Sequence, residues 1–342
     1  MTPVDALAAA VQANCHVSDA RHARDLTLCN YLLAMRELFR WEQRLPPGEP
    51  PRRAEMLRWI GVREALWEEV EGDDWRPLPF GGEAIDPFDV DAVNARLAPE
   101  GLVYGAARGR FGKPHFFLGE LERSEARGAV SIVEVGREYA RDIDASPAAL
   151  RGATVIVRRD AFDRWLWLRA ETWEAQGAGP MRPVLEAYGF ERDRQGALAR
   201  MALEQRETLI LHELGEHAAG EAIGPAWERL MAQADDRRTE ILLRAVRDLL
   251  ADCMVTLPRL LARGDVRAMH FWFGTFEGLR RTLFPRLAAA HESWLANGAL
   301  EALDDTVRAG RAHWARVARE LAAGDFAFAR QRAQAPESLA LP

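Results

Sequence analysis

The first part of the chain carries apolar residues at helical spacing. Leucine, methionine and phenylalanine side chains recur every three or four positions between Leu26 and Phe39, and this pattern predicts a helix. Ser18 or Asp19 is the expected N-cap, because a short polar side chain can accept from the first free backbone N–H groups. A second helix is expected over 52–70.

After Asp160 the helical pattern returns and continues almost to the end of the chain. Pro258 and Pro285 should break or kink helices, because proline lacks the N–H donor. The last residues, 326–342, lose the periodicity, so a frayed tail is expected. Helices are expected near 161–175, 181–188, 195–219, 224–234, 237–262, 268–296 and 299–323.

The segment 101–157 has a different pattern. Short runs rich in β-branched and aromatic residues alternate with glycines, which predicts four short strands in a small antiparallel sheet. Inside it, the stretch 105–113 is glycine-rich like a phosphate-binding loop. Pro114 stands where that motif needs Ser or Thr, so a hairpin with glycines in left-handed positions is expected instead. The segment 73–89, dense in Pro, Gly and Asp, is expected to be a loop.

These patterns define a fold class that is mainly α, a multi-helix bundle with a small antiparallel β-sheet insertion, α+β overall. A length of 342 residues is enough for about two domains. We expect an N-terminal helical region over 1–100 and a small antiparallel β region over 101–158. A C-terminal helical domain over 159–335 is expected to pack with the N-terminal helices.

Composition narrows the classes of partner. The net charge of -7 disfavours nucleic acid and anionic membranes, and no apolar run is long enough to span a bilayer. Three cysteines and no secretory signal favour the cytoplasm, and a homodimer is left open as the assembly. The 45 basic residues include one lysine, Lys113; the rest are arginines, whose planar guanidinium binds carboxylates in a fork.

The strongest local signal for chemistry is the segment HELGEH at 212–217. On a helix, residues four apart share a face, so His212 pairs with Glu216 and Glu213 pairs with His217. Imidazole and carboxylate groups are ligands for zinc, iron or manganese. The sequence therefore predicts a divalent metal here, with His212, Glu216 and His217 among its ligands.

The same segment resembles the HELLGH zinc motif of the dipeptidyl peptidase III family. This resemblance implies that His212 and His217 bind zinc and that Glu213 is the general base of a mononuclear zinc hydrolase. The substrate, a small molecule or a peptide, is not identified. In an ideal α-helix the two histidines lie roughly 140° apart, so shared coordination needs a π-bulge, which Gly215 would ease.

Four charged residues, Glu240, Arg244, Asp248 and Asp252, follow one another at four-residue steps. Such a ladder is typical of an exposed helix face with salt bridges along it. The alternative is that Asp248 or Asp252 donates a third metal ligand to the HELGEH helix.

A second candidate site lies near the N-terminus. Asp19 and His22 have the i, i+3 spacing used in carboxylate-bridged di-metal bundles, and His16 precedes them closely enough to join. An alternative function is therefore an oxidase-like iron or manganese site that joins these residues with the HELGEH helix. The plainer interpretation is that Asp19 caps a helix and pairs with an arginine.

A third alternative is not enzymatic. The His and Glu clusters would then be structural, and the arginine-rich surface of a helical interaction module would bind an acidic partner. Metal content separates this alternative from the two enzyme hypotheses, since only they need a bound ion.

The opening NCHVSDARHARD and the later LILHELGEHAAG resemble a family of uncharacterised proteobacterial proteins. The resemblance continues through the segments GREYARDI, RAVRDLLADC and FWFGTFEGLRR, so it covers most of the chain. That family has no established activity, and the resemblance implies no mechanism.

Overall fold

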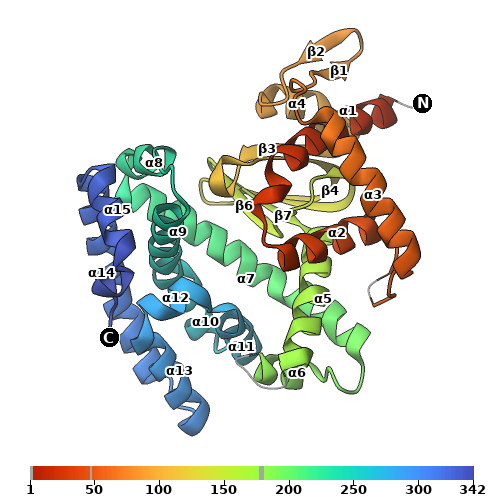
Figure 1. The fold of residues 1–342 in the computed structure, drawn as a ribbon. Helices are drawn as coiled ribbons and strands as arrows, with labels where there is room; N and C mark the ends of the chain where they lie inside the picture. The colour runs from red at the N-terminus through yellow and green to blue at the C-terminus, as the bar shows by residue number, and fades with distance from the viewer. Residues whose placement is uncertain (1–2, 47, 177–180) are drawn as a thin grey trace. The chain divides into compact units, whose positions relative to one another are not determined.

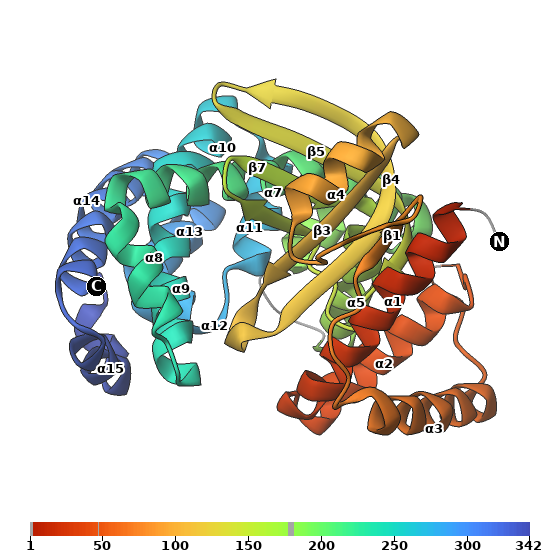
Figure 2. The ribbon, with the colours of Figure 1, turned by 90° about the horizontal axis from the view of Figure 1, so that it is seen from above.

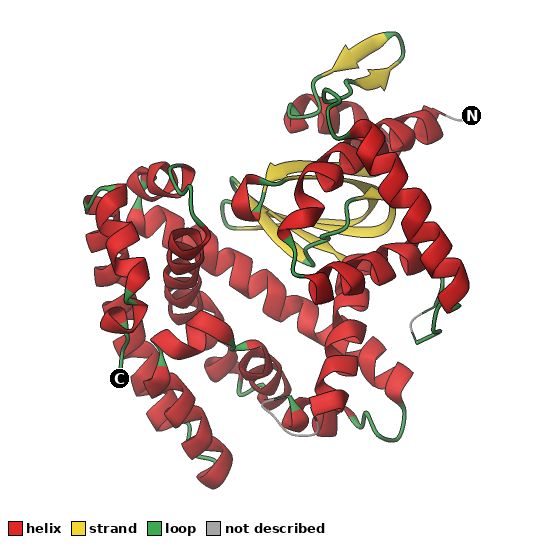
Figure 3. Cartoon of the chain, viewed as in Figure 1, coloured by secondary structure: helices red, strands yellow, loops and turns green. Residues whose placement is uncertain are grey.

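The computed structural model describes residues 3–46, 48–176 and 181–342. Helices dominate and strands form a smaller part, so the predicted fold class, mainly α with a β-sheet part, is confirmed (Figure 3). The described chain divides into two compact units. The first comprises Met1–Ala126, Ser131–Pro147 and Ile156–Leu168, and the second comprises Arg127–Val130, Ala148–Val155 and Arg169–Pro342.

The first helix begins earlier than expected, and the second predicted helix, over 52–70, agrees with the helix Arg53–Val70. The helix α1 (Pro3–His22) already contains Ser18 and Asp19 near its end, both fully buried, so the prediction that they cap a following helix is wrong. The next long helix starts after a short 3₁₀ turn, with Thr27 as its N-cap. The next α-helices along the chain are α2 (Leu28–Glu42), α3 (Arg53–Val70) and α4 (Val90–Leu97).

The predicted β region is confirmed, with one strand more than expected. The strand order is β3-β4-β5-β7-β6, and the long curved strands stand out in Figure 2. β3 pairs antiparallel with β4, and Gly112 between them has φ 71°, so the predicted hairpin is confirmed. The strands are β3 (Leu102–Arg108), β4 (Pro114–Arg127), β5 (Val130–Arg141), β6 (Ala148–Arg151) and β7 (Thr154–Arg158).

The segment 73–89 is not wholly a loop. It contains a two-stranded antiparallel hairpin, β1 (Leu78–Phe80) with β2 (Glu83–Ile85). Gly81 and Gly82 form its turn with positive φ, which glycine adopts without steric cost. Short strands that lack alternation escape a pattern-based prediction.

The core of the first unit forms where α1 meets the sheet. Val11 and Cys15 of α1 pack with Tyr104 of β3 and Phe116 of β4, all buried. A second cluster joins the end of α1 with α2 and α3 around Met35. Because α1 is packed on both sides, the polar side chains in its last turns are held in place.

The second unit is an assembly of helices with α7 (Arg194–Ile223) as its longest member (Figure 1). α7 packs against α9 (Arg237–Ala251), and α9 packs against α14 (Glu301–Ala323). The tail forms a further helix, so the prediction of fraying is wrong. The remaining helices here are α6 (Arg182–Tyr188), α8 (Pro225–Ala232), α10 (Leu257–Arg263), α11 (Val266–Thr275), α12 (Gly278–Leu283), α13 (Pro285–Asn297) and α15 (Phe326–Gln334).

Both predicted proline breaks are confirmed. Pro258 lies in the first turn of α10, directly after a π-helical segment (Asp252–Thr256), and Pro285 begins α13. The helix α5 (Arg159–Gln176) also agrees with its predicted bounds. Among the described helices, none combines the length and the apolar character that crossing a membrane requires.

Candidate functional site

The HELGEH residues lie in the middle of α7, where this helix crosses the end of α9. A Cβ placed on Gly215 would come within 2.6 Å of the carbonyl oxygen of Ala251. Only glycine allows this approach without a shift of one backbone. The close crossing brings the carboxylates of α9 and of the π-helical segment next to the histidine side of α7.

His212 is held by a buried carboxylate. Its Nδ1 donates to Oδ1 of Asp252 over 2.9 Å. That carboxylate also accepts from Trp272 and Arg280, each over 3.1 Å, and it is fully buried. The imidazole is therefore fixed in orientation, and its Nε2 is left facing Glu216 at 3.6 Å.

One group of three potential metal ligands occurs among the described residues, and it is His212, Glu216 and Asp248. One ligand atom from each lies within 4.8 Å of the other two. Arg247 contacts the same carboxylates, at 2.6 Å from Glu216 and 3.4 Å from Asp248. Burial works against the charge of Glu216, but Arg247 lowers its pKa to about 2.

Glu213 completes this group of side chains, which with Asp252 we call the His212 cluster. Its carboxyl is buried, and no hydrogen bond from the described part of the chain reaches it. Burial and the neighbouring Glu216 raise the pKa of Glu213 to about 8. Burial likewise raises the pKa of Asp248, and Glu216 adds to this effect. Burial opposes the charge of His212, but Asp252 raises the pKa of His212 well above its usual value. Without a metal, the cluster thus holds its charge balance partly by keeping a proton on Glu213.

His217 is not part of this three-residue group. α7 is α-helical through Gly215, and the π-helical segment lies at Asp252–Thr256 instead. The expected bulge that would turn both histidines to one side is therefore not at Gly215. The sequence left open whether Asp248 or Asp252 is the third potential ligand. In the structure Asp248 belongs to the three-residue group and Asp252 does not.

The charged ladder on α9 is not an exposed face. Glu240 is 5% exposed and Asp252 is fully buried, so that interpretation is wrong. Glu240 pairs with Arg244 at 2.7 Å, as the four-residue spacing predicts. The ladder is instead the side of α9 that packs inward, and its last member fixes His212.

The second predicted site belongs to the first unit and has a different character. Asp19 is fully buried and pairs with Nζ of Lys113 at 2.8 Å, while its oxygens also accept from the N–H of Ile143. Burial raises the pKa of Asp19 to about 6, and Lys113 acts against that rise. The prediction of an arginine partner is wrong, because the partner is the one lysine of the chain.

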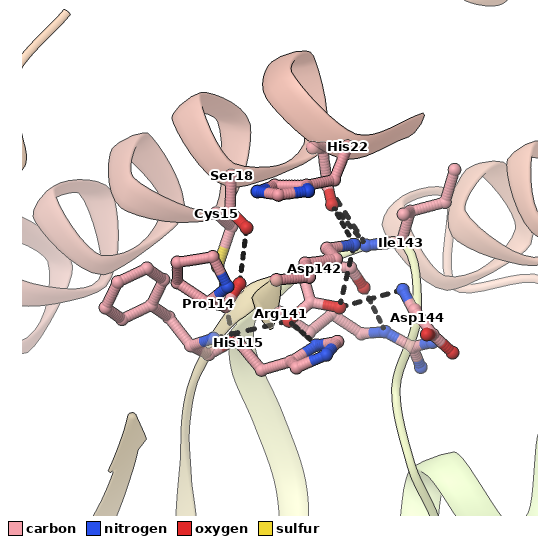
Figure 4. Close-up of polar contacts among 12 residues, drawn as sticks. Cys15, Ser18, His22, Pro114, His115, Arg141, Asp142, Ile143 and Asp144 are labelled. Atoms are coloured by element: carbon pink, nitrogen blue, oxygen red, sulfur yellow. Dashed lines mark hydrogen bonds and ion pairs between the residues drawn. The ribbon is translucent and has the colours of Figure 1, made fainter. Parts of the chain in front are cut away.

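Asp142 is the other carboxylate that holds Lys113. It accepts from Nδ1 of His115 over 3.1 Å and from two backbone N–H groups, those of Phe116 and Asp144 (Figure 4). Burial alone would raise the pKa of Asp142, but His115 and Lys113 bring it well below its usual range. We call Asp19, Lys113, His115 and Asp142 the Lys113 cluster.

His16 and His22 do not join the Lys113 cluster as ligands of one ion. The ring of His16 lies against Arg63, with Nη1 at 2.7 Å from Nε2, and burial together with Arg63 lowers the pKa of His16 to about 3. His22 contacts Asp25 at 3.4 Å. In the described residues no group of three potential ligands includes His16, Asp19 or His22.

Sequence reasoning missed Lys113, His115 and Asp142. Lys113 and Asp19 lie 94 residues apart in the chain, so no local spacing connects them. The signal that could have found Lys113 is compositional. In a chain whose other basic residues are arginines, a single lysine marks a place where a compact ammonium group fits and a planar guanidinium does not.

The fold and its sites define a two-part, mainly helical protein, with the Lys113 cluster in one unit and the His212 cluster in the other. The chain belongs to the DUF6866 family: residues 6–158 match its N-terminal domain and residues 163–339 its C-terminal domain, both described as a family of unknown function. This confirms the predicted kinship with an uncharacterised family. Proteobacterial distribution, cytoplasmic location and a homodimer stay predictions. No curated protein and no solved structure matches the chain.

Proposed function

We propose that the second unit binds one divalent metal ion, with zinc favoured over iron or manganese, through His212, Glu216 and Asp248. We propose further that this centre makes the protein a metal-dependent hydrolase. The observation that carries the proposal is the donor set, one imidazole and two carboxylates within 4.8 Å of one another. These donor types are the ones that zinc accepts from proteins.

The geometry of the donors fits a metal ion. Zinc ligands at about 2.1 Å in a tetrahedron lie roughly 3.4 Å apart. Nε2 of His212 and Oε1 of Glu216 are 3.6 Å apart, close to that edge. Metal-binding histidines almost always donate their other ring N–H to a carboxylate or carbonyl, as His212 does to Asp252.

The position of Glu213 supports the proposed hydrolytic role. When bound, the metal would lower the pKa of a coordinated water and polarise a substrate carbonyl. Glu213 precedes Glu216 by one helical turn, and its carboxyl has no other hydrogen-bond partner among the described residues. Because the pKa of Glu213 is about 8 without a metal, the charge of a bound ion would be needed to ionise its carboxyl. In this proposal the ionised Glu213 accepts the proton of the attacking water, while His212 and Asp252 stay fixed.

A structural role is the second candidate, and Arg247 favours it. Its guanidinium already contacts both carboxylates of the donor set, so the ion pair can neutralise part of their charge without a metal. A metal ion must compete with Arg247 for Glu216. Removing this arginine therefore distinguishes the two candidates.

Zinc titration of the chelator-treated protein tests the proposal, with a chromophoric chelator as competitor. We expect one equivalent to bind and, at a hundred times the Kd, to stabilise the fold by about 2.7 kcal/mol. His212→Gln, Glu216→Gln and Asp248→Asn should each weaken binding at least tenfold. His217→Gln is the matched control on the same helix and should bind zinc as the wild type does.

Three further variants sharpen the result. Asp252→Asn should weaken zinc binding by about 10–100-fold, the usual effect of removing a group that orients a ligand. Arg247→Gln should strengthen it, because the competing cation is gone. Glu213→Gln should keep zinc and lose hydrolysis of peptide or ester substrates. If neither zinc, manganese nor iron(II) binds in stoichiometric amounts, the metal hypothesis is wrong and the structural role stands.

A further inference from the structure

The first unit contains a cavity of about 490 Å³ that is separate from the Lys113 cluster. Side chains of α1, α2, β5 and α5 line it together with Arg44, which follows α2, and all of them belong to this unit. Cavities of this size hold small organic ligands. Among the lining residues are three arginines: Arg44, Arg137 and Arg164.

The carboxylates beside the cavity are already engaged by other groups. Glu42 pairs with Arg63 at 2.5 Å. Glu138 pairs with the buried Arg158 at 2.5 Å and lies 3.7 Å from Arg141. The negative charge of these two glutamates is therefore directed to arginines that do not line the cavity. The third lining carboxylate, Asp160, accepts from the backbone N–H of Glu138 over 3.3 Å.

The three lining arginines lack such partners. Within the described chain, none of them forms an ion pair with a carboxylate, and Arg137 lies over the ring of Tyr139 at 5.1 Å. Burial lowers the pKa of Arg164, and the nearby charge of Arg141 lowers it further. Nearby Asp160 acts in the other direction and favours the charge of Arg164. The wall itself holds three arginines and three carboxylates, and an excess of positive charge arises because Arg63 and Arg158 already pair with Glu42 and Glu138.

Two further observations concern arginines in or beside the cavity. Arg141, 4% exposed, lies behind the wall near Trp41, and its Nη1 has no hydrogen-bond partner, only the ion pair with Glu138 at 3.7 Å. Arg44 has φ 53°, a left-handed conformation that costs a non-glycine residue about 1 kcal/mol or more. Glycine would avoid this cost, so the guanidinium at this place is expected to have a role that offsets it.

We propose that this cavity binds a small molecule through a phosphoryl or carboxylate oxyanion, held by Arg44, Arg137 and Arg164. Guanidinium groups form paired hydrogen bonds with such oxyanions, and an anion would supply the charge that the engaged glutamates do not. The proposal does not depend on the metal site of the second unit, because all the residues involved belong to the first unit.

Isothermal titration calorimetry with pyrophosphate and with citrate, at constant ionic strength, tests the proposal on the full chain. We expect saturable binding of one of them, and the tighter ligand identifies the phosphoryl or the carboxylate class. Arg164→Gln should weaken that binding at least tenfold. Arg58→Gln, an exposed arginine on α3, is the matched control and should leave the Kd unchanged.

A second variant keeps the test decisive if Arg164→Gln fails to fold. Arg44→Gly should raise the midpoint of thermal unfolding, because it relieves the left-handed strain, and should still weaken binding at least fivefold. Stability and affinity then change in opposite directions, which general damage to the fold cannot produce. Absence of saturable binding of either anion, or equal affinity of the wild type and both variants, would overturn the proposal.

Discussion

The Lys113 cluster and the His212 cluster both bury acidic groups, but they differ in how these groups are satisfied. In the Lys113 cluster the carboxylates accept from an ammonium group, an imidazole and backbone N–H groups. In the His212 cluster, Glu213 receives no hydrogen bond from the described residues and Asp248 receives one long contact from Arg247. Protein donors alone satisfy the carboxylates of the first cluster. In the second, the side chains of Glu216 and Asp248 are 12% and 20% exposed, so water or a cation can reach them.

The difference shows that buried charge alone does not identify a functional site. A complete set of donors indicates a structural role, because every lone pair already has a partner. An incomplete set needs another explanation, such as an ion or a ligand. The same argument applies to the cavity of the first unit. There the groups without ion-pair partners are arginines, so the expected ligand is an anion.

The largest expected effect of a substitution is at Lys113. Lys113→Met leaves Asp19 and Asp142 buried without their shared cation, which should lower the free energy of unfolding by about 3–5 kcal/mol. Urea unfolding followed by circular dichroism measures this. The double variant with Asp19→Asn should recover part of the loss, because one uncompensated charge is removed as well.

Lys113→Arg tests the compositional argument. Arginine keeps the charge but cannot replace a compact ammonium group between two buried carboxylates, so this variant should also be destabilised. Equal stability of Lys113→Arg and the wild type would show that the space at position 113 does not require a lysine. It would also weaken the contrast between the two clusters.

Sequence reasoning found the His212 cluster more completely than the Lys113 cluster, for a physical reason. His212 and Glu216 are one helical turn apart, so their contact follows from helix geometry once α7 is predicted. Asp248 was one of two candidates on a helix that could also have been exposed. The choice between them depends on how α7 and α9 cross, and local patterns do not contain that information.

The Lys113 cluster could not be predicted from local sequence patterns, because its members come from distant segments of the chain. Asp19 lies on α1, Lys113 directly precedes β4 and Asp142 directly follows β5. The alanine-rich start of α1 lacks a marked apolar stripe, so the pattern placed the first helix too late. A residue expected to cap a helix then proved to be buried in its last turn.

A medium effect is expected where α7 crosses α9. Gly215→Ala places a Cβ 2.6 Å from a backbone oxygen, so the helices must move apart. Despite the better helix propensity of alanine, the free energy of unfolding should fall by about 1–2 kcal/mol. If the His212 cluster binds zinc, affinity should fall too, because the ligands of α7 and α9 separate.

Gly220→Ala is the matched control for this substitution. It lies on the same helix, and nothing is within 4 Å of the added Cβ. It should therefore stabilise the protein by up to about 1 kcal/mol through helix propensity alone. If both alanine variants gain stability, the two helices do not need their close approach.

The smallest effect depends on pH. Burial opposes the charge of His212, but Asp252 raises the pKa of His212 well above 6.5, so without zinc both clusters respond to pH in the same direction. His115 and His212 each donate Nδ1 to a buried aspartate. Burial opposes the charge of His115, but Asp142 raises its pKa above the usual 6.5. The native state therefore binds the proton more tightly than the unfolded state, so the stabilisation is complete below about pH 6.5 and is lost as the pH rises through the native pKa.

Wild type and His115→Gln should accordingly differ by about 1 kcal/mol at pH 5.5 and converge at high pH. For His22→Gln the pH dependence should have the opposite sign. Burial lowers the pKa of His22, so the wild type loses stability relative to this variant as the pH falls below about 6.5. Stabilisation by zinc at the His212 cluster should also disappear on acidification, since metal ligands must be deprotonated. Urea unfolding at pH 5.5, 7 and 8.5, with and without zinc, measures both effects. His115 stabilises the fold when it is protonated, whereas His212 must be deprotonated to bind zinc.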